Sequence, residues 1–136
     1  MGLVEIASGT AWITLLLLGA QASLGLLRVR AWPAADNSVR SPRAWLLAGH
    51  TVIGLVLPAM ALAHGWFSMK LPGICGKCAS GLWIATAAFL LLGVQAVTGI
   101  TMLRLREPQR VAVRRLHSVM AVLLAALVGA HVLLNG

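Results

Sequence analysis

The chain has 136 residues, of which 60% are hydrophobic and only 10% are charged, and its mean hydropathy is +0.91. A soluble domain of this size needs a far more polar surface, so this composition favours a protein that lies within a lipid bilayer and excludes a separate soluble catalytic domain. The net charge of +8 is gathered in the connections between apolar stretches, as in membrane proteins, so we expect no nucleic acid among the partners.

Four stretches are long and apolar enough to cross the bilayer, which takes about 20 mainly apolar residues in a helix. They cover residues 8–27, 44–66, 80–103 and 111–134. The sequence therefore predicts an all-α membrane protein. Its single domain, residues 1–136, is expected to be a four-transmembrane-helix bundle.

The first and third stretches share a motif. Residues 16–25 read Leu-Leu-Leu-Gly-Ala-Gln-Ala-Ser-Leu-Gly, and residues 90–99 read Leu-Leu-Leu-Gly-Val-Gln-Ala-Val-Thr-Gly. A basic turn follows each copy and leads into a helix with two histidines. We interpret the chain as two parallel helical-hairpin repeats, about residues 8–66 and 80–135, related by an axis along the membrane normal.

Basic residues are concentrated in the first and third connections. The second connection has only Lys70 and Lys77, and the other nine are Arg28, Arg30, Arg40, Arg43, Arg104, Arg106, Arg110, Arg114 and Arg115. The positive-inside rule then predicts that residues 28–43 and 104–115 are cytoplasmic. Both termini are expected on the outer side, and the membrane is expected to be a bacterial inner membrane.

All four histidines lie in the second and fourth stretches. His50 and His64 are fourteen residues apart, and so are His117 and His131. Fourteen residues return a helical side chain to within about 40° of the same face and advance it by about 21 Å. Because both helices run in the same direction, we expect His50 to share a level with His117, and His64 with His131.

Two imidazoles per level suit haem better than zinc. A structural zinc site uses four protein ligands and a catalytic site usually three, whereas haem brings its own equatorial nitrogens and needs only axial ligands. Facing helices of a bundle commonly build such a site. The spacing predicts two haem b groups, one on each side of the membrane. Interhelical hydrogen bonds and a proton or metal path remain alternatives for these histidines.

Small residues on the first and third stretches repeat the histidine interval. Ala11 and Gly25 are fourteen residues apart on one face, and Ala85 and Gly99 are fourteen apart on the equivalent face. We expect these four residues to face the haems. Ordinary packing of small residues between membrane helices is the alternative.

Polar residues near the predicted haems are further candidates. Gln21 and Gln95 should lie between the two haem levels, bonded to each other, to a haem edge or to water. Thr51 and Ser118 each follow a ligand histidine and are candidates to hydrogen-bond it. Arginines suit the propionates of the cytoplasmic-side haem, and the candidates are Arg28, Arg43, Arg104, Arg114 and Arg115.

The histidine pattern, with small residues at matching spacing on the partner helices, resembles the four-helix haem-binding core of the cytochrome b family. The resemblance covers nearly the whole chain. It implies two six-coordinate b haems that pass electrons across the membrane, with His50 and His117 as iron ligands on the cytoplasmic side and His64 and His131 on the outer side. The chain lacks the quinol-site motifs of larger members, so a quinone stays open. The expected function is electron transfer within a larger redox or respiratory assembly of subunits.

The only two cysteines form the motif Cys75-Gly-Lys-Cys78. Ala79 stands where a c-type haem attachment site requires histidine. A local disulfide, half of a metal site shared with another subunit, and a redox-active pair all fit the motif. The last of these underlies an alternative function, a membrane thiol-disulfide oxidoreductase that uses a quinone. A haemless transport or structural subunit is another alternative.

Overall fold

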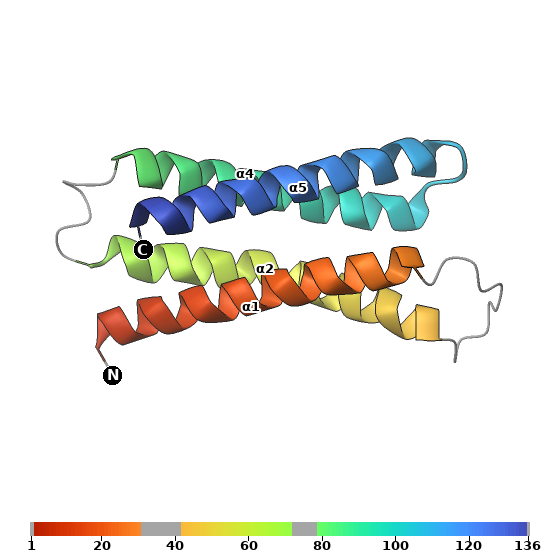
Figure 1. Cartoon of the computed structure of the whole chain (residues 1–136). Coiled ribbons are helices and arrows are strands. Elements are labelled where there is room, and N and C mark those ends of the chain that lie inside the picture. Colours follow the sequence, from red (N-terminus) through yellow and green to blue (C-terminus); the bar gives the residue numbers. More distant parts are fainter. Residues whose placement is uncertain (1, 31–41, 72–78, 136) are drawn as a thin grey trace.

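A computed structural model describes residues 2–30, 42–71 and 79–135 of the chain. Four helices make up nearly all of this part: α1 (Leu3–Arg30), α2 (Pro42–Met69), α4 (Ala79–Arg104) and α5 (Gln109–Asn135). The described residues contain no strand. The prediction of an all-α four-helix bundle is confirmed (Figure 1).

Each helix contains a segment that is long and apolar enough to cross a membrane. These segments are Leu3–Leu27, Ala44–Met69, Gly81–Arg104 and Gln109–Leu134. A helix of 24 residues is about 36 Å long, more than the hydrocarbon thickness of about 30 Å. Hydrocarbon offers no partners to backbone N–H and C=O groups, so the chain must satisfy them internally as continuous helix. The protein is therefore an integral membrane protein.

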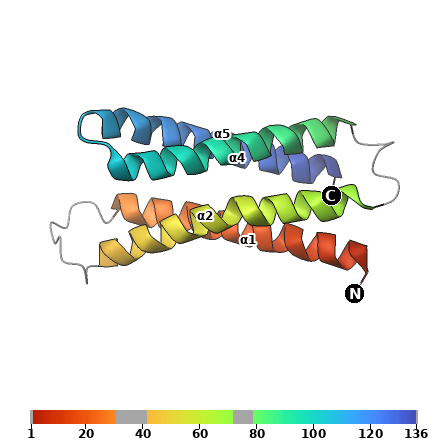
Figure 2. The same cartoon turned by 180° about the vertical axis from the view of Figure 1, so that it is seen from behind.

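The helices form two hairpins that lie side by side. α1 packs along α2, and α4 packs along α5, while the hairpins meet chiefly through α2 and α4 (Figures 1 and 2). The starts of α1 and α4 and the ends of α2 and α5 share one end of the bundle. α2 and α5 therefore run parallel, as the sequence predicted. The sequence duplication behind the two hairpins stays a prediction.

The outer faces of the helices are apolar and exposed, as suits contact with lipid. Trp45 and Trp83 are among the most exposed large side chains, and they lie near the starts of α2 and α4, at opposite ends of the bundle. Tryptophan favours the two membrane–water interfaces. Their positions at the two ends of the bundle are those expected for tryptophans of a membrane-spanning bundle.

The best-packed part of the interior is an apolar layer midway along the helices. Leu57, Ala88, Leu92 and Leu124 form this buried cluster, and Leu18 packs against it. Leu57 and Leu124 each lie midway between the two histidines of their own helix. The layer therefore separates the bundle into two levels, each with one histidine from α2 and one from α5.

Candidate haem site

At one level, the rings of His50 and His117 lie edge to face across the interface between the hairpins. Their centroids are 6.3 Å apart, and their planes are inclined at 68°. Two imidazoles on opposite sides of one metal ion, each bonded at about 2.0 Å with its centroid about 1.15 Å beyond the nitrogen, have centroids about 6.3 Å apart. We call this pair the His50–His117 level. Its spacing matches that of two axial ligands.

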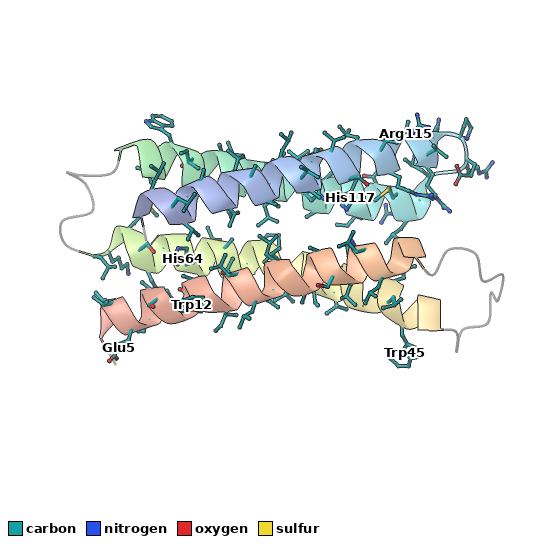
Figure 3. The ribbon with its side chains drawn as sticks, viewed as in Figure 1. Glu5, Trp12, Trp45, His64, Arg115 and His117 are labelled. Carbon is teal, nitrogen blue, oxygen red and sulfur yellow. The ribbon has the colours of Figure 1, made fainter. Side chains whose placement is uncertain are left out.

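The other two histidines lie toward the opposite end of the bundle. The ring atom Nδ1 of His64 lies 3.1 Å from the backbone oxygen of Ala7, and Nδ1 of His131 lies 3.2 Å from that of Gly81. Ala7 and Gly81 lie near the starts of α1 and α4. We call this pair the His64–His131 level. Figure 3 shows His64 and His117 toward opposite ends.

Hydrogen bonds to backbone carbonyls define the protonation of three histidines. His50 Nδ1 lies 3.2 Å from the backbone oxygen of Gln21, a contact of the same kind as those of His64 and His131. A carbonyl oxygen can only accept, so Nδ1 carries the proton and donates in each case. The lone pair is then on Nε2. This is the tautomer that binds a metal through Nε2.

His117 reaches the same tautomer through a hydroxyl group. Thr98 Oγ1 lies 3.2 Å from His117 Nδ1 and donates a hydrogen bond of 2.9 Å to the backbone oxygen of Gln95. The hydroxyl has one proton, which is directed at that carbonyl, so Thr98 accepts from the Nδ1–H of His117. Metal-ligating histidines almost always donate their other ring N–H in this way. All four histidines are thus in the same tautomer, with the proton on Nδ1.

Gly25 and Gly99 lie directly against the histidine rings of the His50–His117 level. A Cβ atom placed on Gly25 would lie 3.5 Å from His50 Cε1, and one placed on Gly99 would lie 3.4 Å from His117 Cε1. The glycines therefore accommodate an imidazole of their own hairpin, whereas the sequence suggested that they face the haem. Ala11 and Ala85, the small residues expected at the other level, are half-buried.

The amide groups of Gln21 and Gln95 contact the two histidines of the His50–His117 level. Gln21 Nε2 lies 3.3 Å from His50 Nε2, and Gln95 Nε2 donates to the backbone oxygen of His117 at 3.0 Å. The amides reach these atoms because hydrocarbon offers no other hydrogen-bond partner. Gly54 leaves the space that the Gln21 amide fills, since a Cβ there would lie 2.9 Å from Gln21 Nε2.

The side-chain amides of Gln21 and Gln95 decide whether a metal-containing group fits between His50 and His117. The Oε1 atoms of Gln21 and Gln95 are buried and have no hydrogen-bond partner among the described residues. Buried polar atoms without a partner commonly mark a place for water or a ligand. The Gln21 amide also contacts Nε2 of His50, the nitrogen that would bind a metal. Loading the site therefore requires this amide to turn aside.

Of the five arginines expected at the propionates, Arg104, Arg114 and Arg115 have side chains that the structure describes. Arg114 Nη2 pairs with Glu107 Oε1 at 3.8 Å, so a carboxylate of the chain already neutralises it in part. The side chain of Arg43 lies outside the described residues.

Arg110 is a candidate that the sequence interpretation missed. Its Nε atom is buried and has no partner within the described part of the chain. Arg110 precedes His117 by seven residues, which places the two side chains on the same face of α5. Arg43 precedes His50 by the same interval. Comparing the two histidine helices residue by residue would have found it.

Two residues expected to support the histidines do not contact them. Thr51 and Ser118 donate to carbonyls of their own helices, those of Leu47 and Arg114. A hydroxyl within a helix commonly bonds the carbonyl four residues earlier, which holds it away from the neighbouring ring. Instead, Thr98 contacts His117, and Ser68 Oγ lies 3.5 Å from His64 Nδ1.

The described residues hold no group of three or more His, Cys, Asp or Glu side chains that could bind a metal ion. A zinc site with three or four protein ligands is therefore not formed within residues 2–30, 42–71 and 79–135. Two Nε2 lone pairs per level fit a group that brings its own equatorial nitrogens, as haem does. Cys75 and Cys78 lie outside the described residues.

No protein-family model matches the chain, and comparisons with curated proteins and with solved structures give no match.

Proposed function

We propose that this protein is a transmembrane electron carrier with two b-type haems, one bound by His50 and His117 and the other by His64 and His131. The observation that carries the proposal is the 6.3 Å separation of the His50 and His117 ring centroids, which is close to the separation of two imidazoles that bind one metal ion. The Nδ1 hydrogen bonds support it, because each places the lone pair of the ring on Nε2, the nitrogen through which such a histidine binds a metal.

Residues of the chain define the path that electrons would take across the membrane. When bound, each haem iron would accept and release one electron by cycling between its ferric and ferrous states. The fourteen-residue histidine interval separates the levels by about 21 Å along the helix axis, so the pairs lie near opposite faces of the bilayer. The buried apolar layer that contains Leu57 and Leu124 lies between the two levels. Arg43, Arg110 and Arg114 are suited to neutralise propionates at the His50–His117 level.

We propose that the carrier serves a larger redox or respiratory assembly, because two histidines would hold each haem and would leave it no open site for chemistry on a substrate. Its partners are then other subunits, with a quinone as a further candidate.

We predict that the purified protein binds two haems per chain. The reduced-minus-oxidised visible spectrum should be that of low-spin haem b, since two imidazoles fill the axial positions. Haem extraction as the pyridine complex, divided by protein concentration, gives the stoichiometry. A preparation that stays haem-free when haem is supplied during expression would refute the proposal and favour the thiol or structural alternatives.

The cysteine motif separates these alternatives. A thiol oxidoreductase must lose all activity when Cys75 and Cys78 are both replaced by serine, whereas a haem carrier keeps both haems in that variant.

We predict that the C-terminus lies on the outer, periplasmic side of a bacterial inner membrane. Nine of the basic residues lie in the first and third connections, and only Lys70 and Lys77 lie in the second. Connections that are rich in Lys and Arg stay in the cytoplasm. A reporter enzyme that is active only outside the cytoplasm should be active when fused after Asn135 and inactive when fused after Arg106. The opposite pattern would invert the topology.

A further inference from the structure

The two histidines of the His50–His117 level are held by different contacts. In the first hairpin, His50 Nδ1 donates directly to the backbone oxygen of Gln21, over 3.2 Å. The residue of α1 that aligns with Thr98 in the shared motif is Leu24, whose side chain has no hydroxyl. No side-chain oxygen from that position can therefore enter the contact between His50 and α1.

In the second hairpin, a hydroxyl is inserted into the same contact. Thr98 Oγ1 accepts a hydrogen bond from His117 Nδ1 over 3.2 Å and donates one to the backbone oxygen of Gln95 over 2.9 Å. The Gln95 amide also donates to the backbone oxygen of His117 over 3.0 Å. One turn of α4 therefore holds both the ring and the backbone of His117.

The other threonine near this end of α4 differs. Thr101 is exposed and donates to the carbonyl of Val97, four residues earlier in its own helix. Thr98 thus joins its helix to a histidine, whereas Thr101 makes a bond that any helical threonine can make.

We propose that Thr98 is a positioning residue that holds His117 in its Nδ1–H tautomer and lowers the reduction potential of the iron bound by His50 and His117. This inference rests on the proposed function. A hydrogen bond accepted from Nδ1–H raises the basicity of the ring and strengthens its donation to the metal. Stronger donation stabilises ferric iron over ferrous iron. Because the hydroxyl is itself a donor to a carbonyl, its oxygen is polarised and accepts more strongly.

The test replaces Thr98 with valine, which has the same shape and no hydroxyl. We expect the midpoint potential of the His50–His117 haem to rise and that of the other haem to stay unchanged. Thr98→Ser keeps the hydroxyl and should keep the original potential. Thr101→Val is the matched control and should also leave both potentials unchanged. Each potential is measured by spectroscopic redox titration of the purified, haem-loaded chain.

The outcomes separate this inference from the proposed function. Absence of haem from the unaltered protein overturns both. Bound haem with equal potentials in the unaltered protein and Thr98→Val overturns the role of Thr98 alone. If Thr98→Val loses its haem, nitrogen NMR of haem-free protein decides: we expect the Nδ1–H form of His117 in the unaltered chain and a mixture of tautomers in Thr98→Val. The same tautomer population in both would overturn the inference.

Discussion

Replacing either His50 or His117 with alanine is expected to remove one haem and leave the other, so that the haem content falls from two per chain to one. The two rings share a level, with centroids 6.3 Å apart, so losing one ring leaves the iron with a single protein ligand. The variants His64→Ala and His131→Ala should each remove the other haem. Haem content and redox titration of each variant measure the effect.

The four variants together test which histidines share a haem. Both members of a level must leave the same surviving haem, recognised by its potential. If His50→Ala and His131→Ala left the same survivor, the pairing would be wrong. Ser118→Ala is a suitable control, because Ser118 is next to His117 and donates only to the carbonyl of Arg114 in its own helix. It should keep both haems.

The bundle could be predicted from sequence because the bilayer imposes it. A stretch such as residues 44–66 has no polar partners in hydrocarbon and must form a helix that satisfies its own backbone. The level shared by His50 and His117 followed from the helical repeat, since fourteen residues return to nearly the same face. The midway positions of Leu57 and Leu124 follow from the same arithmetic.

The contacts that hold the histidines were harder to predict. His64 and His131 bond to backbone oxygens of Ala7 and Gly81, and a backbone carbonyl leaves no trace in the residue type. Thr98 was overlooked because the matching position in the first hairpin is a leucine. A comparison of two similar hairpins shows what they share, whereas this contact is a difference between them.

The hydrogen-bond partners of the glutamines could not be predicted for a related reason. Helical register places the Cα atom of Gln21, but the long side chain then selects its own partner. The structure shows that the partner is His50, within the space left by Gly54. Register alone cannot predict that choice, because it depends on a gap that a third residue leaves on another helix.

Replacing Gly99 or Gly25 with leucine is expected to weaken binding of the His50–His117 haem strongly. A Cβ on Gly99 would already lie 3.4 Å from His117 Cε1, and one on Gly25 would lie 3.5 Å from His50 Cε1. Alanine is therefore in ordinary contact and should be tolerated. The further carbons of leucine must displace the ring, and overpacking of this kind costs about 1–3 kcal/mol, or about 5- to 150-fold in haem affinity.

The motif that contains these glycines also supplies the controls. Gly19 and Gly93 have nothing within 4 Å of an added Cβ and lie on exposed faces of α1 and α4. Gly19→Leu and Gly93→Leu should therefore keep both haems. Haem content and redox titration of the four leucine variants measure the difference. Retention of both haems with unchanged potentials in Gly25→Leu and Gly99→Leu would show that the rings do not need the space beside these glycines. An equal loss in all four variants would instead indicate a general disturbance of the helices.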